Sequence, residues 1–171
     1  MNKEAQGFSL IELLIVVVII GIIAAIAIPN LLAARRSANE GSTVSGLRTL
    51  HGAQMTYSAT YGNGDYAGAI ATTGTTQALS ELGTPGLIDA VLRTGTKSGY
   101  NFVGGRVAKS TSSPATFFFA ANPSTTSGMT QTGARRFGIA TEGVMMADPT
   151  AVNLGTAYTG TTISAATPLS N

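Results

Sequence analysis

The fold is decided by residues 8–28, FSLIELLIVVVIIGIIAAIAI, a run of 21 residues in which Glu12 is the only charged side chain. An α-helix rises about 1.5 Å per residue, so about 20 apolar residues cross the hydrocarbon layer of a bilayer. A helix also satisfies every backbone donor and acceptor within itself, as a segment in lipid must. The run therefore predicts a membrane-spanning helix.

A polar leader of seven residues, MNKEAQG, stands before this run. An ordinary signal peptide has its small-residue cleavage site after an apolar region of about 7 to 15 residues. Here the small residue, Gly7, comes first, so cleavage after Gly7 would remove residues 1–7 and keep the helix. Lys3 favours a cytoplasmic N-terminus, although Arg35 and Arg36 follow the other end of the run. We expect the N-terminus to lie inside.

Residues 29–61 continue the helical pattern beyond Pro29. One face has mostly apolar residues at spacings of three and four: Val44, Leu47, Leu50, Gln54, Tyr57 and Tyr61. The opposite face is polar and is expected to be solvated: Arg35, Arg36, Asn39, Glu40, Thr43 and Arg48. Pro29 lacks an N–H and crowds the preceding turn, which predicts a bend there. Residues 62–64, Gly-Asn-Gly, should end the helix near residue 60.

The remaining chain predicts a small antiparallel sheet. Residues 62–96 read as a connecting region with short helices at 77–82 and 87–92, separated by the breaker GTPG at 83–86. Strand patterns follow, bounded by turn residues, at 100–103, 116–121 and 136–140, with a possible fourth at 143–147. Within residues 97–148 no helix-length segment separates them, which favours an antiparallel meander packed on the amphipathic half of the helix.

The expected fold class is therefore α+β, a long bent N-terminal helix packed on three to four strands. The tail, residues 149–171, is rich in Thr, Ala and Ser, and no regular structure is predicted for it. Phe117, Phe118 and Phe119 predict a strand with one or two rings in the core. Arg135 and Arg136 are interpreted as a solvated strand end.

Composition argues against catalysis, metal binding and nucleic-acid binding. Only 11% of the residues are charged, and the basic clusters are too sparse for a nucleic-acid groove: Arg35-Arg36, Arg106 with Lys109, and Arg135-Arg136. The chain has no Cys, so neither a disulfide nor a thiolate site forms. The single His51 is assigned to packing, and no nucleophile and base stand together. We predict no enzyme activity, no catalytic residue, no metal and no cofactor.

Two loops imitate phosphate-binding motifs without their context. Residues 62–67, GNGDYA, fit G-x-G-x-x-A but follow a helix rather than a strand, so they are interpreted as a helix stop. Residues 95–98, GTKS, lack the glycine spacing of a phosphate loop. Neither motif predicts a nucleotide site.

Residues 7–30, GFSLIELLIVVVIIGIIAAIAIPN, closely resemble the processing and assembly segment of type IV pilins and of the pseudopilins of type II secretion. The resemblance implies that a prepilin peptidase cuts between Gly7 and Phe8 and that the new amino group of Phe8 is methylated. It further implies a precursor held in the inner membrane, an assembly platform, and a helical homopolymer that ends as an extracellular pilus.

Glu12 corresponds in this resemblance to the glutamate at the fifth mature position. A carboxylate within a bilayer costs roughly 2.5 to 3.5 kcal/mol on insertion scales, and a neighbouring subunit's Phe8 ammonium would offset that cost and set the register between subunits. The alternative is that Glu12, about 6 Å from the helix start by rise, only reaches toward the headgroups.

Gly21 and Pro29 bracket residues 22–28 with one helix-weakening residue at each end. The resemblance implies that this stretch unwinds in assembled filaments. The alternative interpretation is that Gly21 and Ala25 let neighbouring helices approach closely.

Three functions therefore stay open. The first is a structural subunit of a type IV pilus-like filament, whether for motility, adhesion or DNA uptake. The second is a type II secretion pseudopilin, although the calcium-loop pattern expected near the end of major pseudopilins is not visible. The third is a binding domain merely tethered by the helix. The sequence does not decide whether the subunit is major or minor, its adhesion target, glycosylation, conductivity, or what fixes the Cys-free tail.

Overall fold

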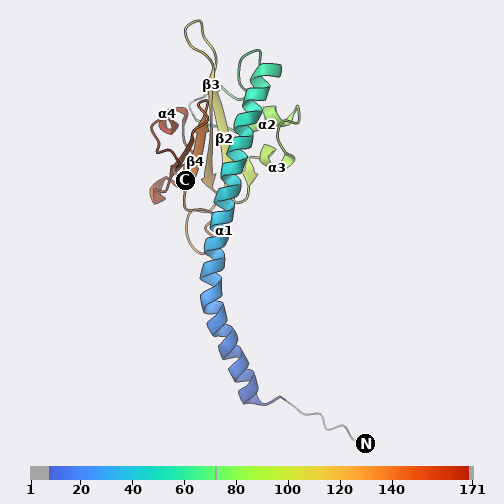
Figure 1. Ribbon diagram of the computed structural model, residues 1–171, viewed down its shortest axis with the longest axis vertical. Helices are drawn as coiled ribbons and strands as arrows, with labels where there is room; N and C mark the ends of the chain where they lie inside the picture. The colour runs from blue at the N-terminus through green and yellow to red at the C-terminus, as the bar shows by residue number, and fades with distance from the viewer. Residues whose placement is uncertain (1–7, 72, 170–171) are drawn as a thin grey trace, which may run out of the picture. The chain divides into compact units, whose positions relative to one another are not determined.

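The computed structural model describes residues 8–71 and 73–169 and divides the chain into two units, Met1–Arg35 and Arg36–Asn171. The predicted leader, with Lys3 and Gly7, lies outside the described residues, as do residues 170–171 at the end of the tail. A single helix, α1 (Leu10–Thr60), contains residues of both units (Figure 1). The predicted long helix is therefore confirmed.

In the first unit, α1 is apolar on every side. Its most apolar 18-residue window has a mean hydropathy of 3.2, and none of that window is buried within the chain. By length and composition, α1 is long and apolar enough to cross a membrane. The helix continues through Pro29 without interruption, and the bend expected there stays a prediction.

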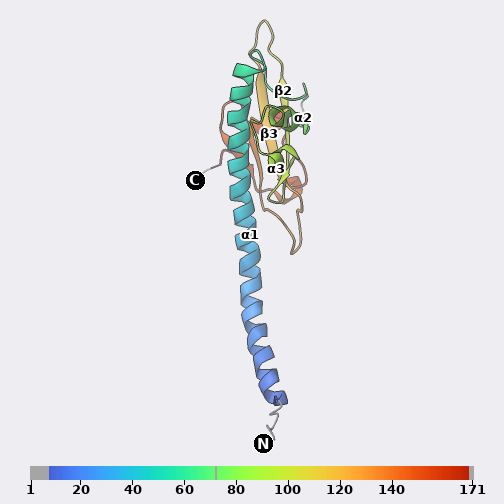
Figure 2. The ribbon, with the colours of Figure 1, turned by 90° about the vertical axis from the view of Figure 1, so that its right-hand side faces the viewer.

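In the second unit, α1 is amphipathic and packs on the sheet (Figure 2). Leu47, Leu50 and Ala53 are buried as the pattern predicted, while Tyr61 at the helix end is exposed. The predicted solvated face is wrong at two positions, because Glu40 and Thr43 are buried. A loop near residue 133 covers that side of the helix, and the hydroxyl of Thr43 donates to the Asn39 carbonyl at 2.8 Å.

The helix ends where the sequence predicts. Asn63 and Gly64 have positive φ angles of 47° and 85°, and the Gly64 N–H donates to the Ser58 carbonyl at 3.0 Å. Glycine adopts such a backbone without steric cost. The chain then runs back along the helix, where both polar atoms of the buried Gln54 amide bond the backbone of Ala67, at 2.8 and 2.9 Å.

The connecting region contains α2 (Gln77–Gly83) and α3 (Ala90–Arg93). The first confirms the helix predicted at 77–82. The second is shorter than the predicted 87–92, because the Asp89 carboxylate accepts the Leu92 N–H at 2.8 Å and caps the helix there. Residues 87 and 88 therefore precede the helix.

The sheet has five antiparallel strands in sequence order, one or two more than predicted. They are β1 (Thr96–Lys97), β2 (Tyr100–Val107), β3 (Thr116–Pro123), β4 (Arg136–Ala140) and β5 (Met145–Asp148). The missed strand is β1, which has only two residues. It pairs with β2 across Ser98 and Gly99, whose φ angles of 50° and 72° suit a two-residue hairpin turn. Residues 95–98 thus start a hairpin.

Both faces of the sheet are covered, so all three phenylalanines of 117–119 are buried rather than one or two. Side chains alternate along a strand. Phe117 and Phe119 therefore face α1 in the main core, and Phe118 faces the tail together with Tyr158 and Ile163. The sequence pattern did not reveal this second hydrophobic cluster.

The tail, for which no regular structure was predicted, forms a short 3-10 helix, η1 (Ala151–Asn153), and one helical turn, α4 (Gly160–Ile163). Thr159 and Thr162 cap α4 reciprocally. The tail approaches β4 closely, since a Cβ on Gly138 would lie 2.5 Å from the Ile163 side chain. Its last described residue, Leu169, donates its N–H to the Met145 carbonyl at 2.7 Å.

Polar contacts around one ion pair, between Arg136 in β4 and Asp148 at the end of β5, hold the start of the tail. The Arg136 guanidinium contacts the Asp148 carboxylate at 2.8 Å and donates to the Thr156 carbonyl at 3.1 Å. It also lies 4.1 Å from the centre of the Tyr158 ring. Arg136 is thus largely buried and contacts the tail, so it is not a solvated strand end.

Candidate assembly segment

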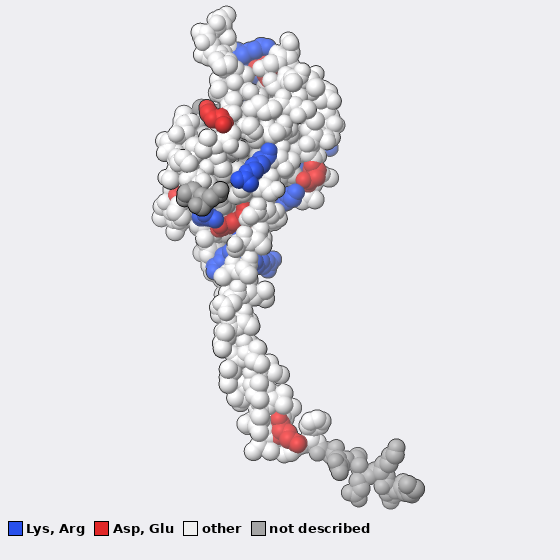
Figure 3. Space-filling view, in the orientation of Figure 1, with Lys and Arg blue, Asp and Glu red and all other residues white. Residues whose placement is uncertain are grey.

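The N-terminal part of α1 exposes nearly every large apolar side chain it carries. Phe8, two residues before the helix, is 90% exposed, and the leucine, isoleucine and valine side chains that follow are at least half exposed in most cases. In the space-filling view this part of the chain shows one charge, as expected from Glu12 (Figure 3). Such a surface becomes dry only in lipid or among similar helices.

Glu12 caps its own helix. Its Oε2 accepts the backbone N–H of Ser9 at 2.9 Å, one of the donors that a helix start leaves unpaired. Ser9 is the residue before the helix and Glu12 is its third, so the pair is half of a capping box. Neither alternative weighed from the sequence included this contact, although the S-x-x-E pattern of residues 9–12 signals it. The pairing with a neighbour's Phe8 stays a prediction.

The structure describes only the residue that follows the predicted cleavage site. Phe8 precedes the helix and is exposed, whereas Gly7 lies outside the described residues. Residues 8 and 9, which follow the predicted cleavage site, are exposed, and neither is helical. Cleavage between Gly7 and Phe8 stays a prediction.

Gly21 and Pro29 both lie inside continuous helix. A Cβ on Gly21 would meet no atom within 4 Å, so nothing in the described chain requires glycine there. Beside Pro29, the Asn30 side-chain amide donates to the Ile26 carbonyl at 3.1 Å, one turn earlier. Unwinding of residues 22–28 and close approach of helices at Gly21 both stay predictions for the assembled state.

A buried carboxylate at the start of the second unit was missed by the sequence analysis. Glu40 accepts the Ala134 N–H at 2.7 Å, and its other oxygen lies 2.8 Å from the Arg135 guanidinium. The Asn39 amide donates to the Thr132 carbonyl at 2.9 Å. These contacts bind α1 to residues 131–135, and we call them the Glu40 contact. Arg135 is therefore paired rather than a solvated strand end.

Tyr100 extends the Glu40 contact into the core. Its hydroxyl donates to the Arg135 carbonyl at 2.8 Å, and burial, together with the nearby Glu40 charge, raises the pKa of Tyr100 above its usual range. A Cβ on Gly133 would lie 1.8 Å from that hydroxyl. Gly133 therefore has to be glycine for the loop to lie against Tyr100.

His51 packs as predicted. Its ring centre lies 5.4 Å from that of Phe117, and its Nε2 lies 3.3 Å from the Thr141 carbonyl oxygen. Among the described residues, no group of three or more His, Cys, Asp and Glu side chains is arranged to hold a metal.

Comparison with known proteins matches the N-terminal part of the chain. Residues 2–28 match the family described as the prokaryotic N-terminal methylation motif. The chain is 66% identical over 38 residues to the type IV wide pilus major component PilA4 of Thermus thermophilus, covering 22% of this chain and 29% of that one. It is 45% identical over 56 residues to the type IV major pilin protein PilA of Myxococcus xanthus, covering 33% and 26%.

A third relative is the type II secretion system core protein G of Klebsiella pneumoniae, 38% identical over 55 residues, covering 32% of this chain and 39% of that one. The matched part thus spans well under half the length of each of these relatives. No solved structure matches the chain.

Proposed function

We propose that this chain, whose N-terminal segment is that of the type IV pilin and pseudopilin family, is a structural subunit of a type IV pilus-like filament. The observation that carries the proposal is the exposed apolar segment of residues 8–34, which is helical from Leu10 and whose only charged side chain is Glu12. Hydrophobic burial drives such helices together outside lipid, and a repeated contact that does not close produces a helical filament.

Before assembly, the same helix anchors the precursor in the inner membrane with its N-terminus in the cytoplasm. A prepilin peptidase then cleaves between Gly7 and Phe8, and Phe8 is methylated. The exposed, non-helical backbone at residues 8 and 9 supports this order of events, because the cleaved bond adjoins accessible chain. The assembly platform then receives the helix from the membrane.

Glu12 has two successive roles in this proposal. In the precursor it caps its own helix through Ser9. After cleavage, the Phe8 ammonium of a neighbouring subunit becomes a stronger partner, because an ammonium bears a full charge and a backbone N–H only a partial one. This exchange links processing to assembly.

A pseudopilin of type II secretion is the second candidate, favoured by the match to core protein G. The two differ in where the filament ends, because a pilus reaches the cell surface and a secretion pseudopilus does not. Shearing the cells separates the two, since only surface filaments are released.

A tethered binding domain is the third candidate, and it predicts neither processing at Gly7 nor self-assembly. The names of the matched relatives describe pilus and secretion-system components rather than enzymes. We propose accordingly that the chain has no enzyme activity and needs no cofactor.

The deciding experiment is the intact mass of protein sheared from cells that express the chain. The expected mass lacks residues 1–7 and carries one added methyl group, in a fraction enriched in filaments. Full-length protein confined to the membrane, with none in the sheared fraction, would overturn the proposal. Processed protein that stays with the cells would favour the secretion pseudopilus.

A further inference from the structure

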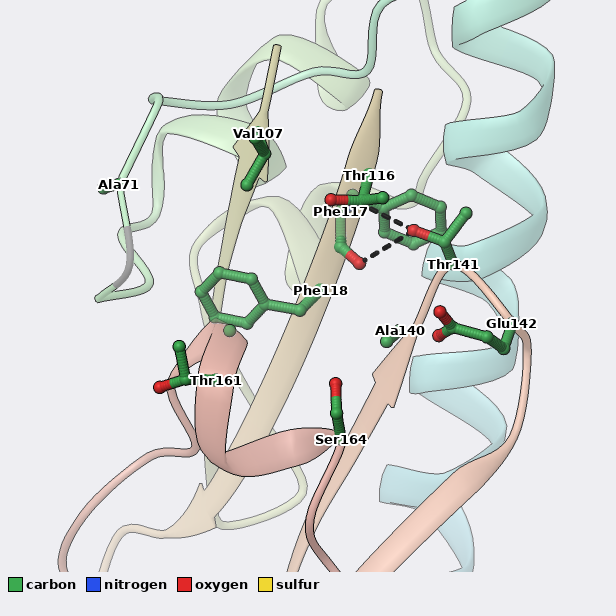
Figure 4. Close-up of a pocket in the computed structure, with 11 residues that line it drawn as sticks. Ala71, Val107, Thr116, Phe117, Phe118, Ala140, Thr141, Glu142, Thr161 and Ser164 are labelled. Atoms are coloured by element: carbon green, nitrogen blue, oxygen red, sulfur yellow. Dashed lines mark hydrogen bonds between the residues drawn. The ribbon is translucent and has the colours of Figure 1, made fainter. Parts of the chain in front are cut away.

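A groove runs along the side of the sheet where the tail packs (Figure 4). It consists of two hollows, of about 240 and 280 Å³, that share Ala140, Glu142 and Ser164. Phe118 and Val107 line the first hollow, and Val144 and Met146 line the second. We call this surface the β4 groove, because Ala140 and Glu142 mark the end of that strand.

Glu142 gives the β4 groove a negative charge. Figure 4 shows its carboxylate beside Ala140, at the end of β4. Its side chain makes no hydrogen bond or ion pair within residues 8–71 and 73–169, and the residue is exposed. Several apolar side chains and one free carboxylate suit an apolar partner surface that carries a cation.

Three exposed arginines make no ion pair in the described part of the chain, namely Arg35, Arg48 and Arg93. Arg35 belongs to the N-terminal unit. Arg48 is one helical turn before His51, whose ring contacts Thr141, a residue that lines the groove, so Arg48 lies close to the groove of its own chain. Lys109 is also exposed and makes no ion pair in the described residues, but its amine already donates to the Asn63 carbonyl. Arg93 therefore remains as the candidate from a different surface.

Arg93 lies across the sheet from the groove. It ends α3, three residues before the first residue of β1, whereas Glu142 follows β4. In the order β1-β2-β3-β4-β5, three strand spacings of about 4.8 Å separate β1 from β4. Figure 1 shows α3 and α4 on opposite sides of the sheet. The Arg93 stem lies over Gly83, where a Cβ would come within 2.5 Å of it, and the nearby Val91 is exposed.

We propose that the β4 groove of one copy receives the α3 edge of a second copy, with Arg93 placed against Glu142. The contact is heterologous, since it joins two different surfaces, and it therefore extends from copy to copy instead of closing as a dimer. The inference rests on the proposed filament and adds a lateral contact between the second units of neighbouring copies, separate from the contacts between their N-terminal helices.

Disulfide trapping tests this contact, and the absence of native cysteine makes it specific. A double variant, Glu142→Cys with Arg93→Cys, is expected to produce a ladder longer than dimers on a non-reducing gel of sheared filaments. A disulfide requires Cα atoms within about 7 Å, so the two cysteines cannot join within one chain across three strands. Each single variant should give dimers at most.

The control pair combines Arg93→Cys with Met129→Cys, because Met129 is also exposed and does not line the groove. If the double variant assembles into filaments but yields no ladder, the groove contact is wrong and the filament proposal still stands. If the wild-type chain forms no filaments, the filament proposal fails instead. A ladder of equal length from the control pair would also overturn the inference.

Charge reversal gives an independent readout in case cysteine disturbs the surface. Glu142→Lys and Arg93→Glu should each lower the yield of sheared filaments, and the two together should restore it. Arg48→Glu is the matched control and should not rescue Glu142→Lys. Normal filaments from both single reversals would contradict the contact, as would rescue by Arg48→Glu.

Discussion

Replacing Asp148, the last residue of β5, with asparagine tests whether its ion pair with Arg136 stabilises the last two strands and the start of the tail. The carboxylate accepts from the Arg136 guanidinium at 2.8 Å, from the Asn153 amide at 2.8 Å and from the Thr150 N–H at 2.8 Å. The side chains of Arg136 and Asp148 are only 12% and 16% exposed. Asparagine keeps the shape but leaves the guanidinium without its countercharge.

Breaking a buried pair from one side costs about 3 to 5 kcal/mol. Because asparagine still offers one oxygen to Arg136 or Thr150, we expect a loss of about 3 kcal/mol in the free energy of unfolding, near the lower end of that range. With a urea slope of about 1.5 kcal/mol/M, the unfolding midpoint should fall by about 2 M.

The assay is urea unfolding of the full chain in detergent, followed by the near-UV circular dichroism of tyrosine. The chain has no Trp, and two of its tyrosines, Tyr100 and Tyr158, are buried in the second unit. Asp89→Asn is the matched control: its pair with Lys97 is exposed, at 47% and 32% of the side chains, and asparagine caps helices as well as aspartate. Such a pair contributes less than about 1 kcal/mol.

Acid should weaken the same link. Burial alone would raise the pKa of Asp148, but hydrogen bonds from Thr150, Asn153 and Arg136 outweigh it and hold the pKa below its usual range. Stability from a depressed carboxyl pKa is present above the unfolded value of about 3.9 and is lost as pH falls below it. The wild type should therefore lose stability below about pH 4 more steeply than Asp148→Asn. Equal midpoint shifts for Asp148→Asn and Asp89→Asn would refute the reasoning.

Three further predictions concern α1. The Glu12→Ala variant should insert into the membrane normally but give a lower filament yield. Glu12→Gln can still cap the helix, but it should also lower the filament yield, because it cannot pair with the charged Phe8 ammonium of a neighbour. A normal filament yield from Glu12→Gln would leave capping as the only role of Glu12. Amide exchange in filaments should be fast across residues 22–28, and full protection there would contradict unwinding. Glu40→Gln should lower the free energy of unfolding in the same urea assay by about 1 to 2 kcal/mol. The loss is modest because the Arg135 side chain is 42% exposed, so that solvent screens its charge. An unchanged urea midpoint would contradict this prediction.

Local signals predicted the elements well. The period of three and four marked the apolar face of α1, and β4 lies at the residues where its strand pattern was read. β1 was missed because two residues are too few for any periodicity. The S-x-x-E spacing of residues 9–12 signals the capping contact between Ser9 and Glu12, whereas the sequence interpretation of Glu12 included only a neighbouring subunit or the headgroups.

Contacts between distant segments were not predictable in the same way. Glu40 and Ala134 are 94 residues apart, and a helical pattern shows which residues share a face but not which loop covers it. The packing of the tail on the sheet was not predicted for the same reason, because it also joins segments that are distant in the sequence. The sequence predicted one or two buried rings among residues 117–119, and only the fold shows Tyr158 and Ile163 covering Phe118.

The division of charge between the two units bears on how a filament would fix its geometry. Hydrophobic burial is non-directional, so a helix that is apolar all round can slide and rotate against its neighbours at little cost. Register must then come from polar groups, and residues 8–34 provide only Glu12. One charge fixes an axial position but not a rotation. A second contact at a different distance from the filament axis, such as Glu142 against Arg93 between second units, would fix the rotation as well. Loss of either contact should therefore make filaments fewer or irregular without preventing membrane insertion of the helix.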